Sequence, residues 1–180
     1  MCGDDYEVFR CDRCHLNSRK VSGGGVLLAI RQAFQARELK DPMWSIVEQV
    51  WVSIKLFDHT VFICVVYFPP DRVRDLDLID VHAQSLQYMI SLALPRDEII
   101  VLGDFNLPGI KWKPWQHGFL HVDTELSTFH AGTASILDNY STCTLLQINN
   151  VTNENGRIVD LCFVSDRDVA PNICTAPAPW

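Results

Sequence analysis

The segment IIVLGDFNLP, at positions 99–108, places two polar residues directly after a run of apolar ones. Four consecutive aliphatic residues followed by glycine predict a short buried strand that ends in a turn at Gly103 and Asp104. Asp104 and Asn106 then lie at the carboxyl end of a core strand, where open α/β sheets usually bind ligands. Asp and Asn are also common turn residues, so the pair predicts either a site or a simple turn.

Apolar patterning in the rest of the chain predicts both strands and helices. Apolar residues recur at spacings of three and four over 75–94 and 125–140, which predicts two helices. Asp58 and His59 predict a two-residue hairpin turn. The predicted strands are 6–10, 26–31, a segment within 45–57, 60–68, 99–102, 144–149 and 157–165. This order predicts an α/β protein whose sheets are not purely parallel.

The length and composition predict one domain over residues 1–180. The chain is 48% hydrophobic and 21% charged, which is typical of globular proteins. It has no apolar run near the roughly 20 residues that a membrane-spanning helix needs. The first ten residues carry acidic groups where a signal peptide needs an apolar stretch, and the seven cysteines lie mostly in apolar runs. We therefore expect an intracellular protein with reduced cysteines, no membrane contact and a monomeric state.

The net charge, the cysteine spacing and the histidines bear on which classes of function the chain can have. A formal net charge of −7 argues against coating of nucleic acid by bulk electrostatics, although it allows an enzyme with a locally basic groove. Cys11 and Cys14 have the spacing of half a zinc site, but no second pair follows. None of the six histidines belongs to a catalytic motif, so we expect each to be an ordinary surface residue.

Four segments, taken in order, suggest a family. They are SGGGVLLAIR at 22–31, VVYFPP at 65–70, VLGDFNLPGIKW at 101–112 and RIVDLCFVS at 157–165. Together they resemble the endonuclease/exonuclease/phosphatase superfamily, and most closely the apurinic-type endonuclease domain of non-LTR (LINE/jockey-like) retrotransposons. The resemblance covers nearly the whole chain. It implies a four-layer α/β sandwich of two packed mixed β-sheets flanked by helices.

The resemblance also implies chemistry: cleavage of phosphodiester bonds with help from Mg²⁺ or Mn²⁺. Such cleavage needs an activated water, charge neutralisation on the phosphate and help for the leaving oxygen. By resemblance, Asp104 orients and deprotonates the water and is a candidate metal ligand, and Asn106 positions the water or the phosphate. Tyr67 matches a tyrosine near the scissile phosphate. Asp160 matches an aspartate that orients a catalytic histidine, and its apolar neighbours suggest that it needs a partner.

Two further segments are candidates for nucleic-acid binding. Lys111, Trp112 and Lys113 combine basic and aromatic side chains, which suit phosphate contact and base stacking. Packing of this aromatic loop on its own domain is the alternative. Asn153 and Arg157 are candidates for contact with the nucleic-acid backbone, and ordinary exposed turn residues are the alternative for them.

Two parts of the family pattern are not found in this sequence. The pattern begins with a strand carrying an asparagine and a second strand ending in a metal-binding glutamate, both before the segment that Tyr6–Arg13 matches. It closes with Ser-Asp-His beyond the strand at 157–165. We therefore expect a domain that lacks its first strands and its terminal Ser-Asp-His segment. A missing general acid or base typically lowers the rate about 10²–10⁴-fold, so we expect reduced or no activity.

The leading interpretation is a DNA-nicking endonuclease of a non-LTR retrotransposon, present as a remnant. One alternative is a non-catalytic nucleic-acid-binding remnant. Another is a phosphatase of the same fold that acts on inositol phosphates or lipid head groups, although the GIKW continuation at 109–112 favours the retroelement group. The expected partners are DNA and a reverse-transcriptase region encoded nearby, and a DNA substrate suggests action in the nucleus.

Overall fold

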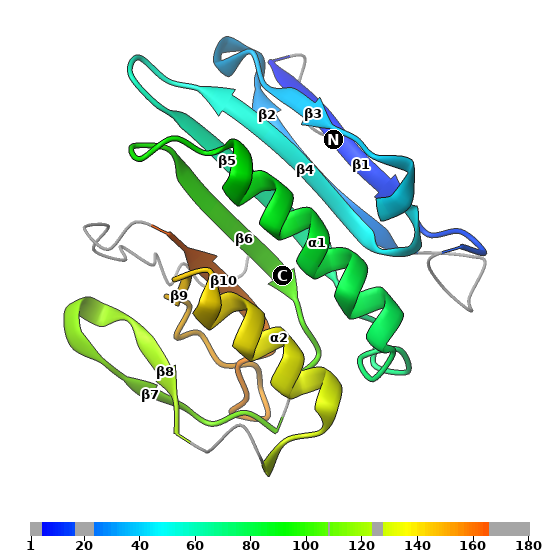
Figure 1. Ribbon diagram of the computed structural model, residues 1–180, viewed down its shortest axis with the longest axis vertical. Coiled ribbons are helices and arrows are strands. Elements are labelled where there is room, and N and C mark those ends of the chain that lie inside the picture. The colour runs from blue at the N-terminus through cyan, green and yellow to red at the C-terminus, as the bar shows by residue number, and fades with distance from the viewer. Residues whose placement is uncertain (1–4, 17–23, 108, 124–127, 166–180) are drawn as a thin grey trace.

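The computed structural model describes residues 5–16, 24–107, 109–123 and 128–165. Its helices are α1 (Leu76–Leu92) and α2 (Ala131–Thr142). Its strands are β1 (Tyr6–Asp12), β2 (Gly25–Arg31), β3 (Arg37–Leu39), β4 (Glu48–Lys55), β5 (Thr60–Tyr67), β6 (Glu98–Asp104), β7 (Trp112–Pro114), β8 (Leu120–Val122), β9 (Leu146–Gln147) and β10 (Asp160–Val164). Eight strands form one sheet in the order β3-β4-β5-β6-β10-β9-β8-β7, and β1 pairs separately with β2 (Figure 1).

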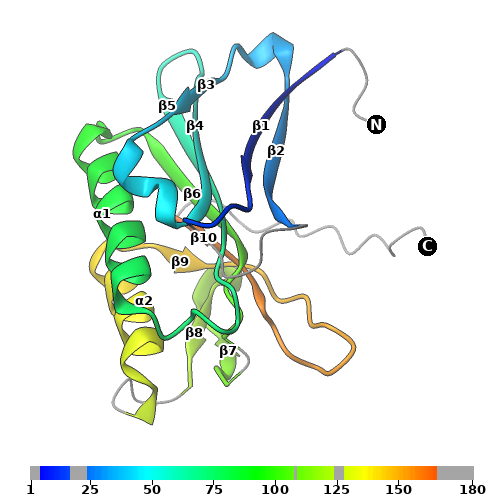
Figure 2. The ribbon, with the colours of Figure 1, turned by 90° about the vertical axis from the view of Figure 1, so that its right-hand side faces the viewer.

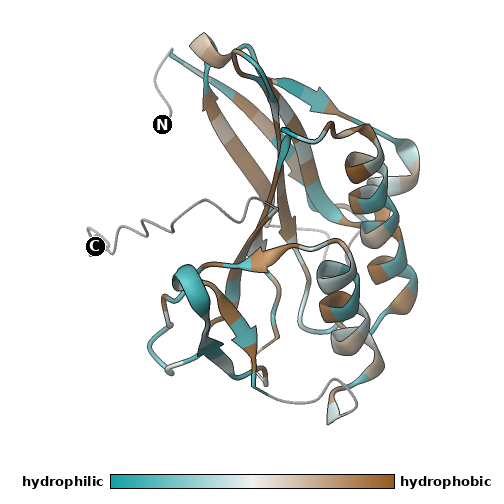
Figure 3. Cartoon of the chain, turned by 60° about the vertical axis from the view of Figure 1, so that its left-hand side comes forward, coloured by the Kyte–Doolittle hydropathy of each residue, from teal (hydrophilic) through white to brown (hydrophobic). Residues whose placement is uncertain are grey.

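The described elements form three layers. Both helices cover one face of the large sheet, and the β1–β2 hairpin covers part of the other face (Figure 2). A large apolar core fills the space between the helices and the sheet, and a smaller one lies beneath the hairpin. The central strands, which face these cores, carry mostly hydrophobic residues (Figure 3). None of the described helices is long and apolar enough to cross a bilayer.

The β5–α1–β6 unit positions Asp104 and Asn106, the polar pair that follows the apolar run at 99–102. β5 and β6 pair in parallel, whereas the other strand pairs of the large sheet are antiparallel. Parallel strands need a crossover, which α1 supplies. Asp75 begins this helix by accepting a hydrogen bond from the Leu78 N–H at 3.4 Å. The crossover places the carboxyl ends of β5 and β6 side by side.

The predicted α/β class with a mixed sheet is confirmed. Strands lie at or overlap every predicted strand position, and the first helix lies within its predicted range. The described residues show three layers, with an antiparallel two-stranded sheet as the second sheet. The β7–β8 hairpin was not predicted, because its two three-residue strands are too short to show a period.

Three local predictions are wrong. β6 continues through Asp104, so Gly103 and Asp104 belong to the strand and not to a turn after it. The β4–β5 turn is centred on Phe57 and Asp58, because the Leu56 N–H bonds to the His59 carbonyl at 2.9 Å and so closes the loop around them. Helix α2 begins at Ala131. The predicted helical residues 125–127 lie outside the described residues.

His82 is buried, contrary to the surface position expected from the sequence. It lies in α1 with 2% of its surface exposed, between β4 and α2. Its Nδ1 is 2.7 Å from Gln49 Oε1, and its Nε2 is 2.7 Å from the Tyr140 hydroxyl. Because an amide oxygen only accepts, Nδ1–H donates to Gln49 and Nε2 accepts from Tyr140. A neutral histidine therefore joins the sheet to both helices.

This network predicts an acid-sensitive fold. Burial lowers the pKa of His82 from 6.5 to about 3. Between these values the unfolded chain binds a proton that the folded chain does not, so the free energy of unfolding falls as the pH falls below about 6.5. We expect His82→Gln to remove about 2 kcal/mol of the stability loss between pH 7 and pH 5. Urea unfolding at pH 7 and pH 5 measures the free energy of unfolding of both proteins. An equal loss between the two pH values in wild type and variant contradicts the prediction. His121→Gln, at an exposed site in β8, is the control.

Candidate active site

Four polar side chains form a row across neighbouring strands of the large sheet. Glu48 of β4 pairs with Tyr67 of β5, Tyr67 pairs with Asp104 of β6, and Asp104 pairs with Asp160 of β10. Directly paired residues point to the same face of a sheet. Tyr67 packs against the smaller core, so the row lies on the face opposite the two helices. Residues 112 positions apart in sequence are thus brought onto one surface.

Gly103 makes this register possible. Its φ of +149° is rarely adopted by other residues, and an added Cβ would lie 1.8 Å from the Val66 carbonyl oxygen. Val66 is its partner on β5, and Leu161 is its partner on β10. Gly103 therefore lets β5 approach β6 closely, directly before Asp104 at the end of β6.

Asp104 and Asn106 are held together by local hydrogen bonds. The Asn106 N–H donates to Asp104 Oδ1 at 2.9 Å, and the Asn106 side-chain amide donates to the Phe68 carbonyl at 2.9 Å. Asn106 has a φ of +48°, a conformation that asparagine tolerates better than most residues. Phe105, between the two polar residues, is fully buried. The pair thus forms an Asx turn, and the same turn fixes both side chains beside Tyr67.

The electrostatics of the row single out Asp104. Partial burial raises the pKa of this carboxyl above its ordinary value, and the nearby Asp160 carboxylate adds to the increase. The Asn106 N–H acts in the opposite direction. A raised pKa makes the ionised carboxylate a stronger base. Asp104 therefore combines a fixed position with the ability to accept a proton.

Asp160 begins β10 and is exposed to solvent. Its flanking apolar residues suggested a partner, and the nearest acidic neighbour in the register is Asp104. The histidine side-chain bonds in the described part of the chain belong to His59 and His82, not to Asp160. The predicted role of Asp160 in orienting a histidine stays a prediction.

Glu48, the first member of the row, is paired with Arg13, and neither residue was predicted from the sequence. Glu48 is fully buried and accepts two hydrogen bonds from Arg13, at 2.8 Å and 3.2 Å. These bonds raise the pKa of Arg13. The Arg13 guanidinium also lies 5.3 Å from the centre of the Tyr67 ring. A glutamate inside an apolar strand was the available signal, because a buried carboxylate needs a partner.

The described residues supply only part of a metal site. Among them, no group of three or more His, Cys, Asp or Glu side chains could hold a metal ion. Glu48 is already paired with Arg13, which leaves the neighbours Asp104 and Asp160. Magnesium often takes one or two carboxylates together with waters and substrate phosphates. Asp104 and Asp160 would thus be the two carboxylate ligands, and waters and substrate phosphates would complete the coordination.

The predicted nucleic-acid-binding residues fall into three settings. Lys111 is exposed, whereas Lys113 forms an ion pair with Asp123. The Trp112 ring packs edge-on against Phe163, with ring centres 6.2 Å apart. Its position in the core matches the alternative of a loop packed on its own domain. The binding roles of Lys111, Trp112 and Lys113 stay predictions.

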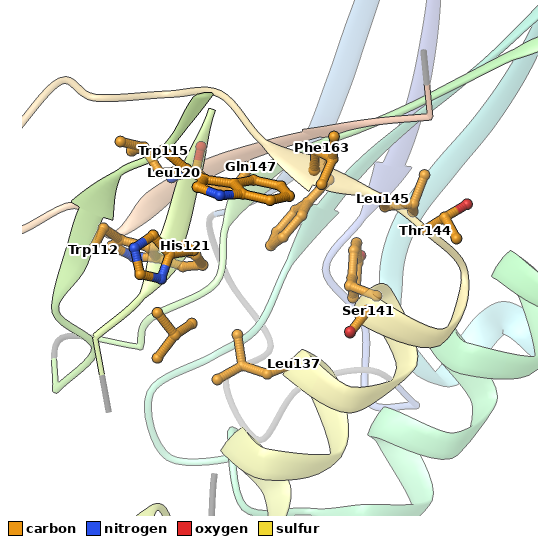
Figure 4. A pocket seen from close by; sticks show the side chains of 13 residues that line it. Trp112, Trp115, Leu120, His121, Leu137, Ser141, Thr144, Leu145, Gln147 and Phe163 are labelled. Atoms are coloured by element: carbon orange, nitrogen blue, oxygen red, sulfur yellow. The ribbon is translucent and has the colours of Figure 1, made fainter. Parts of the chain in front are cut away.

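Trp112 and Trp115 line an apolar pocket of about 520 Å³ between the β7–β8 hairpin and α2. Figure 4 shows their rings with Leu137 and Phe163 around it. Phe163 belongs to the core on the helix side of the sheet, so this pocket is separate from the row.

Asn153 and Arg157 lie in an exposed turn between β9 and β10. The Asn153 side-chain oxygen accepts the N–H groups of Asn155 and Arg157, both at 3.0 Å. This bonding explains why asparagine suits the turn. Contact of Asn153 or Arg157 with a nucleic acid stays a prediction.

The comparison with family models agrees with the resemblance. The model of a family described as endonuclease-reverse transcriptase matches residues 61–178, more than half of the chain. The chain is also similar to a solved structure, the endonuclease domain of TRAS1, a telomere-specific non-LTR retrotransposon, at 17% identity and a TM-score of 0.49. That similarity covers 88% of this chain and 66% of the TRAS1 domain. A search of curated proteins gave no match.

The close approach at Gly103 predicts a large effect of a single methyl group. Gly103→Ala places a Cβ against the Val66 carbonyl and must push β5 from β6, so we expect a loss of about 3 kcal/mol in the free energy of unfolding. Gly109→Ala is the control, because an added Cβ there meets nothing within 4 Å. Urea unfolding of both variants measures the difference, and similar midpoints contradict the expectation.

The buried ion pair predicts a second stability difference. Arg13→Ala leaves the Glu48 carboxylate buried without its charge partner, so we expect a loss of about 3–5 kcal/mol in the free energy of unfolding. Adding Glu48→Gln restores part of this loss, because the neutral amide is less costly to bury. Arg10→Ala, which breaks an exposed pair with Asp12, should cost less than about 1 kcal/mol. Chemical denaturation compares the variants, and a small effect of Arg13→Ala refutes the prediction.

Proposed function

Because the chain belongs to the endonuclease-reverse transcriptase family, we propose that it nicks DNA by metal-dependent hydrolysis of phosphodiester bonds. The observation that carries this proposal is the environment of Asp104. Its carboxyl has a raised pKa, it is fixed against Asn106, and it lies in register between Tyr67 and Asp160. A base with hydrogen-bonding neighbours on one open face is what hydrolysis of a phosphodiester requires.

The proposed roles follow from the contacts of each residue. Asp104 accepts a proton from the attacking water, since its raised pKa strengthens it as a base. Asn106 positions the water or the phosphate, because its bond to the Phe68 carbonyl holds its amide in place. Tyr67 offers its hydroxyl to the phosphate while Arg13 supports its ring. Asp160 keeps the pKa of Asp104 raised through the repulsion of two neighbouring carboxylates.

We further propose that hydrolysis is slow. The row contains no histidine, and the described residues supply only part of a metal site. Lack of a general acid typically lowers the rate about 10²–10⁴-fold. Asp104 and Asp160 would hold Mg²⁺ or Mn²⁺ together with waters, and the metal would supply charge neutralisation on the phosphate oxygens. DNA as substrate places the proposed action in the nucleus, and the family description suggests a reverse transcriptase as partner.

A nicking assay on supercoiled plasmid with and without Mg²⁺ tests the proposal. We expect weak nicking that needs the metal and falls at least about 10²-fold in Asp104→Asn, because this change removes the base while keeping the side-chain shape. Asp80→Asn is the matched control, since Asp80 is an exposed carboxylate on helix α1. Equal nicking by wild type and Asp104→Asn refutes a catalytic role for this site.

The same assay separates the proposal from its main alternative. Circular dichroism first establishes that each variant is folded. If folded wild type binds DNA and gives no nicking at any metal concentration, the chain is a non-catalytic binding protein and the proposal of hydrolysis is wrong.

A further inference from the structure

A groove of about 720 Å³ lies at the carboxyl ends of β5 and β6, on the helix side of the large sheet. Its lining residues come from 70–74 after β5, from 106–107 and 109–111 after β6, and from 128–133, which lead into the first turn of α2. Asn106 lines it, so the groove reaches the residue whose backbone N–H donates to Asp104. We refer to it as the α2 groove.

The charges in the α2 groove differ from those of the whole chain. The chain carries a net charge of −7, yet Arg74, Lys111 and His130 line the groove, and no Asp or Glu appears among its described lining residues. Arg74 and Lys111 are both exposed. Neither forms an ion pair with any residue that the structure describes.

Neighbouring cations outside the groove provide a contrast. Arg72, two residues before Arg74, is paired with Asp75 at 2.8 Å. Lys113, two residues after Lys111, is paired with Asp123. Neighbouring carboxylates thus neutralise Arg72 and Lys113, whereas Arg74 and Lys111 are available for an anion. A single phosphodiester strand, with regularly spaced charges, is an anion that fits an open groove.

The packing of α2 keeps these segments close together. An added Cβ at Gly132 would lie 2.7 Å from the Val73 carbonyl oxygen and 3.3 Å from Arg74 Cα. Only glycine lets the first turn of α2 approach the Arg74 segment this closely. The His130 side chain makes no capping hydrogen bond, and Thr133 lines the groove. The first-turn N–H groups of α2 therefore add to the positive potential that Arg74 and Lys111 create.

We propose that the α2 groove binds the DNA backbone next to the scissile phosphodiester, with Arg74 and Lys111 contacting phosphate oxygens. This inference rests on the proposed function, because it takes the cleavage point to be at Asp104. Contacts of this kind position the strand and carry no sequence information. The groove therefore contributes binding affinity and register, whereas the row contributes the chemistry.

The test is the salt dependence of DNA binding. Fluorescence anisotropy of a labelled duplex is measured in EDTA, so that binding is separate from cleavage. Each lost phosphate contact reduces the slope of log K against log salt by about 0.9, so we expect Arg74→Ala/Lys111→Ala to reduce it by about 1.8. The charge-matched control is Lys55→Ala/Arg37→Ala, because these exposed cations lie near the end of β4 away from Glu48 and neither forms an ion pair with a residue that the structure describes.

Unchanged binding in the groove variant, or equal weakening in both double variants, overturns the inference. Circular dichroism and urea midpoints show whether the variants are folded, as expected for exposed side chains. If nicking depends on Asp104 but the groove variant keeps the salt slope of the wild type, the groove does not bind DNA. The proposed function then stands. If the wild type gives no nicking, and the salt slope falls in the groove variant but not in the control variant, the groove binds DNA. The proposed hydrolysis is then wrong.

A second measurement places the contact along the strand. Duplexes that carry one neutral methylphosphonate are tested position by position. We expect one substitution near the nick to weaken binding by wild type and to have no effect on Arg74→Ala, since the arginine is then already absent. The same loss in wild type and variant at every position contradicts an Arg74–phosphate contact.

Discussion

The close pairing of β5 with β6 at Gly103 determines where every proposed active-site residue lies. The glycine has no Cβ to strike the Val66 carbonyl, so the register continues to the strand ends and places Asp104 beside Tyr67. On the other side of β6, the same register brings Asp160 to Asp104. Because side chains alternate across a sheet, a shift of one residue would turn Asp104 into the helix-side core. The row is therefore a consequence of backbone packing.

The buried pair of Glu48 and Arg13 links this sheet to the segment after β1. A buried ion pair contributes little net stability, because desolvation offsets the attraction, but it is strongly selective for one arrangement. Here Arg13 can satisfy Glu48 only when the β1–β2 hairpin lies over β4, and in that position its guanidinium also faces the Tyr67 ring. Glu48 thus acts on the row by fixing the residue that supports Tyr67.

Local features were predictable from the sequence, and features that depend on distant partners were not. The period of α1 and the apolar run of β6 are contained within single segments, and the Gly-Asp-Phe-Asn motif lies directly at the end of that run. The partner of Glu48 is 35 residues away, and the partners of His82 are 33 and 58 residues away. No local pattern distinguishes a buried, bonded His82 from a surface histidine on a helix. The α2 groove could not be predicted from the sequence either, because three separate segments form it.

The arrangement of charge is compatible with the polyanionic substrate that we propose for this acidic chain. Asp104 and Asp160 repel a phosphate as well as each other, and this repulsion is part of what keeps the pKa of Asp104 raised. Under the proposed function, DNA gains its binding energy beside the carboxylates and not at them. Arg74 and Lys111 are placed for this, because they line the same groove as Asn106, whose N–H is bonded to Asp104. Salt screens exposed charges beyond about 10 Å, so this local pattern outweighs the net charge of −7 at the site.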